Sequence, residues 1–235
     1  MEYETLIIIP TYNEIDNIIR LISRIHQTVP AAHVLVIDDN SPDGTGDAVE
    51  PLTKSDQRVF LLRREGKLGL GTAYLTGFRY ALERGYRYIF EMDADFSHDP
   101  GHLPAFLEAI KGADLVLGSR YVPGGGVENW PLWRQLVSRG GSLYSRVILG
   151  LPYHDLTGGF KCFRRETLEA LGLDSIYSEG YSFQIEMTYR ASRKGFKIVE
   201  IPIVFRERAE GVSKMSRKIF LEAVLRVWQM RLTIS

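Results

Sequence analysis

The first half of the chain alternates short, continuous apolar runs with longer segments of helical periodicity. The apolar runs have the length of strands and are Leu6–Ile9, Val34–Asp38, Val59–Leu62, Tyr88–Met92 and Leu115–Leu117. The segments between them have helical spacing and are Glu14–Gln27, Gly44–Thr53, Gly71–Arg84 and Pro104–Lys111. Apolar strands separated by helices are typical of a parallel sheet buried on both faces. With right-handed crossovers, this order predicts an α/β fold with a Rossmann-like, doubly wound, mostly parallel sheet.

The second half of the chain is dominated by amphipathic helix patterns. A loop rich in turn residues at 122–126 comes first. The helix patterns that follow are Trp130–Leu149, a segment near Phe183–Lys194, and Ile219–Ile234, with a strand expected at Ile198–Phe205. No internal repeat or linker divides the sequence, so we expect one domain over residues 1–235.

Composition narrows the function classes. The chain has 235 residues, of which 45% are apolar, and this supports a substantial core. It has 29 basic and 29 acidic side chains, and zero net charge argues against a nucleic-acid-binding surface. The single cysteine, Cys162, is expected to be a small buried residue and suits a reducing compartment. We expect no secretory signal and no membrane-spanning run, so contact with a membrane would be peripheral.

Unusual polar residues follow each predicted strand. Ligands of doubly wound sheets bind beyond the carboxyl ends of the strands, so these segments should share one rim. The segments are Pro10–Glu14, Asp38–Pro42, Arg63–Lys67, Asp93–Asp95 and Gly118–Tyr121. Asp93 and Asp95 stand two positions apart, which places both carboxylates on one side of an extended segment. Two carboxylates together with substrate phosphates are a usual way to hold Mg²⁺, so this rim predicts a phosphorylated ligand.

The residues after the first two strands suit the organic part of a nucleotide. Tyr12 can contact a base or ribose, Glu14 can accept from ribose hydroxyls, and Asp39 can accept from a base N–H. The alternatives are a helix N-terminal acid for Glu14, a turn aromatic for Tyr12 and a capped turn around Asp38 and Asp39. The two consecutive acids have no basic residue near them in sequence, and this favours a ligand over a turn.

Taken together, these motifs resemble inverting glycosyltransferase family 2, whose fold is the glycosyltransferase A fold. Within that family they are most similar to the polyprenol (dolichol) phosphate mannose synthases. The resemblance runs from Leu6 to about Met215. The matching segments include Asp38–Thr45, Lys67–Gly71, Gly118–Tyr121, Val127–Pro131, Leu156–Phe160 and Gly211–Lys214.

The resemblance implies a role for individual residues. The guanosine part of GDP-mannose would be held by Pro10, Tyr12, Glu14, Ile37 and Asp39. The diphosphate would be bound through Mg²⁺ or Mn²⁺ by Asp93, Ala94 and Asp95, with Ser97 a weaker third ligand because some relatives have Gln there. The phosphates of donor or acceptor would be met by Arg120 and Arg134, with Ser138 on the acceptor phosphate. Arg208 and Lys214 would close over the donor diphosphate.

The implied activity is transfer of mannose from GDP-mannose to a polyprenyl monophosphate with inversion. Residues 1–120 would form the nucleotide-sugar-binding half and 121–235 the acceptor-binding half. The second pKa of a phosphate monoester is about 6, so the acceptor is already a nucleophile at neutral pH. We therefore expect no dedicated general base, with Asp95, Arg120 and Arg134 as the catalytic residues. Two alternatives stay open, namely a family 2 transferase using a UDP-sugar such as UDP-glucose, and a non-catalytic subunit that binds lipid or a partner chain.

The acceptor lipid requires an apolar surface near the site. Trp130–Leu149 and Ile219–Ile234 are apolar on one side with basic residues at the boundary, so they are candidate membrane-surface helices. The alternative is that both simply cover the sheet. We expect a cytoplasmic protein, peripheral on the cytosolic face of a membrane. Many relatives continue into transmembrane helices, so a membrane-anchoring partner subunit is among the partners to be considered.

Overall fold

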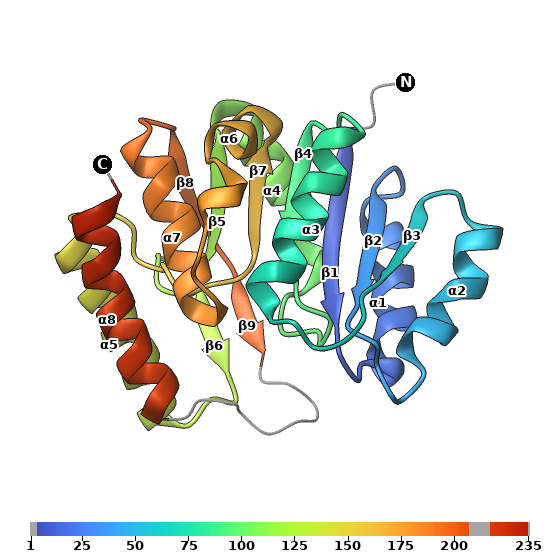
Figure 1. Ribbon diagram of the computed structural model, residues 1–235, viewed down its shortest axis with the longest axis horizontal. Helices are drawn as coiled ribbons and strands as arrows, with labels where there is room; N and C mark the ends of the chain where they lie inside the picture. The colour runs from blue at the N-terminus through green and yellow to red at the C-terminus, as the bar shows by residue number, and fades with distance from the viewer. Residues whose placement is uncertain (1–3, 207–216, 235) are drawn as a thin grey trace.

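A seven-stranded sheet with helices on both faces forms the centre of the computed structural model (Figure 1). The model describes residues 4–206 and 217–234, and it describes side chains at 4–206 and 224–234. The strand order is β3-β2-β1-β4-β7-β5-β8. These strands are β1 (Thr5–Thr11), β2 (His33–Asp38), β3 (Val59–Arg63), β4 (Tyr88–Glu91), β5 (Leu115–Ser119), β7 (Lys161–Arg164) and β8 (Ile198–Pro202). The predicted α/β fold with a doubly wound, mostly parallel sheet is confirmed.

Two helical layers enclose the sheet because successive strand residues point to opposite faces. Ile7 and Ile9 lie in a core shared with α1 (Ile15–Thr28), α2 (Thr45–Ser55) and α4 (Leu103–Ala109). Leu6 and Ile8 face a second core shared with α3 (Leu70–Glu83), α6 (Arg165–Ala170) and α7 (Gly180–Arg193). Short 3₁₀ turns occupy Pro100–His102, Ile110–Gly112 and Leu173–Ser175. Cys162 is a buried free cysteine, as expected.

Strand β7 was not predicted, and it is antiparallel to both of its neighbours, β4 and β5. Its apolar pattern is interrupted by Lys161, which is only 1% exposed and stands opposite Glu91 in the register. A charged residue in the middle of a short apolar run hides the strand from periodicity. The predicted strand over 198–205 is also divided, since β8 ends at Pro202 and β9 (Val204–Arg206) pairs instead with β6 (Gly126–Glu128).

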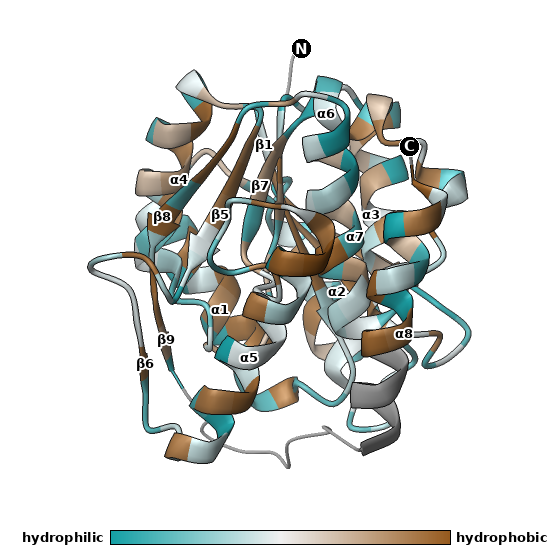
Figure 2. Cartoon of the chain, turned by 90° about the vertical axis from the view of Figure 1, so that its left-hand side faces the viewer, coloured by the Kyte–Doolittle hydropathy of each residue, from teal (hydrophilic) through white to brown (hydrophobic). Residues whose placement is uncertain are grey.

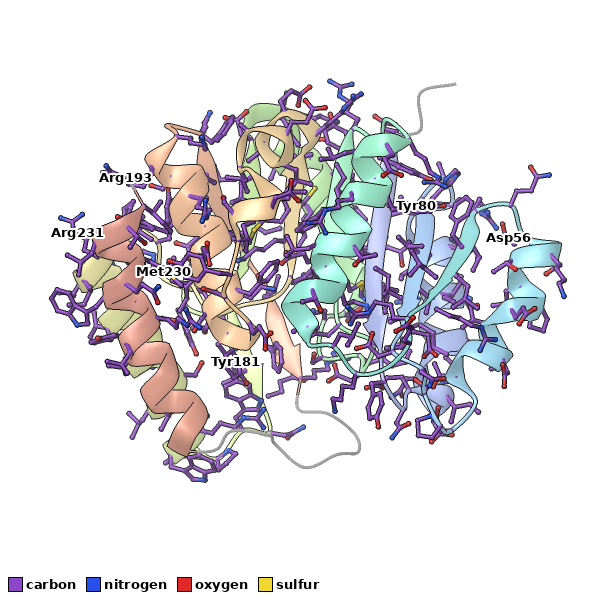
Figure 3. The ribbon with its side chains drawn as sticks, in the orientation of Figure 1. Asp56, Tyr80, Tyr181, Arg193, Met230 and Arg231 are labelled. Carbon is purple, nitrogen blue, oxygen red and sulfur yellow. The ribbon has the colours of Figure 1, made fainter. Side chains whose placement is uncertain are left out.

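Helices α5 (Leu132–Leu149) and α8 (Arg217–Thr233) lie side by side at the end of the molecule farthest from β3 (Figure 1). They pack on α7 through a third apolar cluster rather than directly on the sheet. Met230 of α8 is fully buried there, between α8 and α7 (Figure 3). This arrangement corrects the alternative that both helices simply cover the sheet, because their described apolar contacts are with each other and with α7.

The close approach of α3 to β1 yields a prediction about stability. A Cβ added to Gly77 would lie 2.6 Å from Cγ2 and 2.9 Å from Cδ1 of the buried Ile8. Gly77→Ala should therefore lower the free energy of unfolding by about 1–3 kcal/mol through overpacking. Gly140→Ala in α5 is the matched control, since nothing lies within 4 Å and helix propensity should stabilise it by up to about 1 kcal/mol. Urea denaturation measures both, and equal effects at the two glycines would contradict the packing argument.

Candidate active site at the carboxyl edge of the sheet

The loops after β1 and β2 are tied together by Asp38. Its carboxylate accepts from Thr11 Oγ1 at 2.9 Å, from Ser41 Oγ at 2.5 Å and from the Ser41 N–H at 3.1 Å. Asp39 N–H donates to the Thr11 carbonyl at 3.0 Å. Asp38 is therefore committed to shaping these loops, in agreement with the capped-turn alternative for this residue.

Asp39 has a basic partner that its sequence neighbours did not reveal. Arg64, which follows β3, donates from Nε to Oδ1 at 2.5 Å and from Nη2 to Oδ2 at 2.7 Å. Arg64 also donates to the carbonyl of Gly69 at 3.1 Å and to Thr72 at 2.7 Å, so it links Asp39 to the glycine-containing loop before α3. The premise that Asp38 and Asp39 lack a cation is wrong, because strand pairing brings Arg64 to them. The base-binding role of Asp39 stays a prediction.

The other proposed guanosine-binding residues lie at the same rim. Pro10 and Ile37 are partners in the β1–β2 register, and the Ile37 side chain is fully buried, so Ile37 can offer a ligand only its main chain. Lys67 Nζ lies 4.1 Å from the centre of the Tyr12 ring, and this cation–π contact holds the ring at the loop. Glu14 is half-buried and accepts from Asn17 Nδ2 at 3.0 Å.

Asp93 and Asp95 follow β4 and face this rim from the next strand. The Asp93 side chain is 25% exposed, accepts from the Tyr74 hydroxyl at 3.3 Å and lies 4.0 Å from His98 Nε2. Asp95 is buried and accepts from the Ser97 N–H at 3.0 Å. The Asp93 N–H donates to His98 Nδ1 at 3.1 Å, and burial lowers the pKa of His98, so its ring is neutral with the proton on Nε2.

A buried polar layer lies beneath the acid pair, on the side covered by α3 and α7. It contains Glu91 of β4, Lys161 of β7 and Gln184 of α7, each at most 3% exposed. Lys161 Nζ donates to the Gln184 carbonyl at 2.5 Å. Burial raises the pKa of Glu91 to about 7, although Lys161 and the Gln184 amide work in the other direction. Burial likewise lowers the pKa of Lys161 to about 8, against the attraction of Glu91 and Asp155.

Arg120, at the end of β5, is engaged by Asp155. Its Nε and Nη2 donate to the Asp155 carboxylate, both at 2.7 Å, and Nη2 also donates to Thr157 Oγ1 at 2.9 Å. Burial disfavours both charges, but their mutual attraction raises the pKa of Arg120 and lowers that of Asp155. The rings of Tyr121, Trp130 and Phe205 lie 5.2–5.5 Å from the guanidinium carbon. Direct contact of Arg120 with a phosphate stays a prediction, and Asp155 already balances its charge.

Arg134 and Ser138 come from the first two turns of α5. The Arg134 guanidinium carbon lies 4.1 Å from the centre of the Trp130 ring, so the arginine stacks at the same aromatic group as Arg120. Ser138 Oγ accepts from the Tyr121 hydroxyl at 2.6 Å. The structure therefore brings Arg120, Arg134 and Ser138 together around Tyr121 and Trp130. Arg208 and Lys214 lie outside the described residues.

The acid pair suits a hard divalent cation bound with its substrate. No group of three or more His, Cys, Asp or Glu side chains in the described part of the chain is arranged to hold a metal alone. Two carboxylates are nevertheless what Mg²⁺ or Mn²⁺ requires when phosphate oxygens supply other ligands. The Ser97 hydroxyl is buried next to this pair and has no hydrogen-bond partner among the described residues, which fits its predicted role as a third ligand.

Several residues of this site were not predicted from sequence. They are Tyr74, Glu91, Asp155, Lys161 and Gln184, whereas Arg64 lies in the predicted rim segment Arg63–Lys67 and His98 stands three positions after Asp95. Most lie inside predicted elements or on unpredicted β7, where single charged residues among apolar ones carry no periodic signal. Asp155 immediately precedes the Leu156–Phe160 motif, and a conspicuous acid next to a glycine pair was the available hint.

Comparison with known proteins establishes the family. The model of the family described as Glycosyl transferase family 2 matches residues 6–172. This chain belongs to glycosyl transferase family 2. An undecaprenyl-phosphate mannosyltransferase of Micrococcus luteus is 53% identical over 222 residues, covering 94% of this chain and 91% of the relative. A polyprenol monophosphomannose synthase of Mycolicibacterium smegmatis is 51% identical over 232 residues, covering 97% of this chain and 87% of the relative. The predicted family resemblance is thereby confirmed.

Solved structures agree on the fold of this family 2 chain. Glucosyl-3-phosphoglycerate synthase from Mycobacterium tuberculosis, in complex with Mn²⁺, UDP and glucosyl-3-phosphoglycerate, matches with a TM-score of 0.69 at 18% identity. The match covers 99% of this chain and 81% of that chain. The mannosyltransferase PcManGT from Pyrobaculum calidifontis, in complex with GDP-Man and Mn²⁺, matches with a TM-score of 0.61 at 16% identity. The match covers 99% of this chain and 71% of that chain. The predicted glycosyltransferase A fold is confirmed by these neighbours.

The buried Arg120–Asp155 pair predicts a large loss of stability when one partner is neutralised. Asp155→Asn would leave the Arg120 charge buried without its counter-ion, which should cost about 3–5 kcal/mol in the free energy of unfolding. Asp174→Asn is the matched control, because Asp174 pairs with Arg79 at 2.8 Å but its side chain is 93% exposed. The control should cost less than about 1 kcal/mol. Chemical denaturation would contradict the argument if both variants lost the same stability.

Proposed function

We propose that this chain transfers mannose from GDP-mannose to a polyprenyl monophosphate with inversion at the anomeric carbon. The proposal is carried by the 53% and 51% identity, over nearly the whole chain, to two proteins named for mannosyl transfer to such lipids. The arrangement of the rim supports it. Loops suited to a nucleoside follow β1 and β2, and the acidic residues Asp93 and Asp95 follow β4. Arg120 after β5 and Arg134 of α5 lie on the other side of the acidic residues.

On the donor side, Tyr12, Glu14 and Asp39 would contact guanosine, and Asp93 and Asp95 would hold Mg²⁺ or Mn²⁺. Structural neighbours containing Mn²⁺ support the divalent cation. When bound, the cation supplies charge neutralisation on the leaving diphosphate. Asp95 accepts a hydrogen bond from the Ser97 N–H, and Asp93 accepts one from the Tyr74 hydroxyl. These bonds orient the two carboxylates that would bind the cation.

On the acceptor side, Arg134 would meet the incoming phosphate, because guanidinium groups bind phosphate bidentately. Arg120 would act mainly by positioning, since Asp155 balances its charge and its guanidinium lies beside the Trp130 ring that Arg134 stacks on. The acceptor phosphate is largely dianionic at neutral pH, and its oxygen can attack without a general base. The main requirement is to bring two anions together, and fixed cations meet that requirement.

The exposed side of α5 and α8 would lie on the membrane that carries the acceptor. No helix in the described residues is long and apolar enough to cross a membrane. Large apolar side chains on these two helices are nevertheless 48–80% exposed, namely Leu132, Trp133, Leu136, Leu143, Val147, Leu225, Trp228 and Leu232. Apolar segments recur along both helices (Figure 2). Exposed Arg139 and Arg231 suit anionic lipid headgroups. A peripheral location on the cytosolic face is part of this proposal.

A radiolabel assay tests the reaction and its metal. Purified protein with labelled GDP-mannose, a polyprenyl phosphate and Mn²⁺ should give a chelator-sensitive, labelled lipid product. Asp95→Asn should lower the rate at least about 100-fold by removing a carboxylate from the cation. Asp99→Asn is the control, since an amide oxygen can still accept from the Gly101 N–H, and it should keep most of the activity. Transfer from UDP-glucose but not GDP-mannose would overturn the donor assignment, and full activity of Asp95→Asn would overturn the metal role.

A sedimentation experiment tests the membrane surface. The protein should sediment with anionic liposomes, and high salt should weaken the binding. Leu136→Glu combined with Leu143→Glu places two charges on the exposed side of α5 and should reduce the bound fraction at least about fivefold. Ala31→Glu at the amino edge of the sheet controls for added negative charge and should bind like the unaltered protein. Equal sedimentation with and without liposomes would contradict the proposal.

A further inference from the structure

A small polar cradle lies between Gly159, which stands two residues before β7, and the side chains of His98, Asp93 and Gln184. A Cβ added to Gly159 would lie 3.6 Å from Gln184 Nε2, 3.6 Å from His98 Cε1 and 3.8 Å from Asp93 Oδ1. These are ordinary contact distances, and the φ of Gly159 lies outside the left-handed region. Neither sterics nor backbone conformation therefore requires glycine here. The missing side chain keeps open a point that three different elements surround.

Gln184 brings a buried side-chain amide to this cradle, next to Glu91. Its side chain is 3% exposed, yet neither Nε2 nor Oε1 has a hydrogen-bond partner among the described residues. The amide lies close enough to Glu91 to lower the pKa of that carboxyl, but not in good hydrogen-bond geometry. Glu91 can accept one of the two hydrogens on Gln184 Nε2, and the second hydrogen is then available to another group. Lys161 fixes the main chain of the same residue through its 2.5 Å bond to the Gln184 carbonyl.

The groups around the cradle select for a hydroxyl. Asp93 offers carboxylate oxygens that accept, and Gln184 Nε2 offers hydrogens to donate. A hydroxyl group can donate to the first and accept from the second at once. A phosphate oxygen would face the Asp93 carboxylate with a like charge. The Gln184 amide is closed to solvent, whereas Gly159 and Asp93 are partly exposed, so a ligand group enters from the side of the acid pair.

We propose that Gln184 and Asp93, across the space kept open by Gly159, bind one hydroxyl of the sugar carried by the donor. This inference rests on the proposed function, because the sugar is attached to the diphosphate that Asp93 and Asp95 would hold through their cation. It adds Gln184 and Gly159 to the donor site as residues that recognise the hexose rather than the nucleotide. The ring of His98 lines the cradle with its Cε1 edge, and it stacks on Phe160 with the ring centres 5.0 Å apart.

The test compares GDP with GDP-mannose in two variants. Gly159→Ala fills the cradle with a methyl group, and Gln184→Met removes the amide at similar volume. In the presence of Mn²⁺, each should weaken GDP-mannose binding and lower kcat/KM at least tenfold, while the affinity for GDP changes less than twofold. Gly112→Ala, with nothing within 4 Å, and Gln57→Met, at an exposed position, are the matched controls and should behave like the unaltered protein.

Deoxygenated donors identify the hydroxyl. Among GDP-deoxymannoses, the one that lacks the bound hydroxyl should be a poor donor for the unaltered enzyme. With that donor, Gln184→Met should have nearly the same kcat/KM as the unaltered enzyme. The inference is overturned if both variants use GDP-mannose normally, or if they lose affinity for GDP and GDP-mannose equally. It is also overturned if every deoxy donor lowers kcat/KM by the same factor in the unaltered protein and in Gln184→Met. If the unaltered protein does not transfer mannose at all, the proposed function fails instead. Thermal melting of each variant confirms folding, and Gln184→Met suffices if Gly159→Ala is unstable.

Discussion

The buried ion pair between Arg120 and Asp155 is the interaction on which the second half of the molecule depends. It joins the end of β5 to the loop after α5, and Thr157 extends it to Ser142 on the inner side of α5 at 3.4 Å. Glu200 of β8 holds the same loop by accepting from the N–H groups of His154 and Asp155, both at 2.9 Å. Two opposite charges buried together lose their hydration, and good geometry with further hydrogen bonds is what makes such burial tolerable.

This pair also separates two tasks that arginines perform at the rim. Arg120 is neutralised and fixed, so it organises Tyr121, Trp130 and Phe205 around itself. Arg134 reaches the same aromatic group from the first turn of α5, a helix whose outer side is apolar and exposed. Under the proposed function, a phosphate delivered along the exposed side of α5 would meet Arg134 before the buried Arg120. The acid pair follows β4, and β7 separates that strand from β5, which Arg120 follows.

Strand β7 makes this arrangement possible. It lies antiparallel between β4 and β5, so Lys161 of the strand and Gly159 just before it come from the second half of the chain to the carboxylates of the first half. Lys161 then provides a positive charge inside a region where Glu91 and Asp155 are both buried. It also ties α7 to the sheet through the Gln184 carbonyl. The surroundings of Asp93 and Glu91 are thus built from both halves of the sequence.

The sequence by itself determined the alternation of strands and helices, and with it the sheet edge along which Asp39, Asp93 and Arg120 are placed. Apolar periodicity and strand-end polarity are local properties, so they can be seen without a fold. The residue partners were decided only by the tertiary structure. Arg64 lies 25 positions from Asp39, Asp155 lies 35 positions from Arg120, and Gln184 lies in a different element from Gly159. The role of a buried charge or amide depends on the residues that pack against it. Contacts between segments that are distant in sequence produce no periodic pattern in the chain, so they could not be predicted from it.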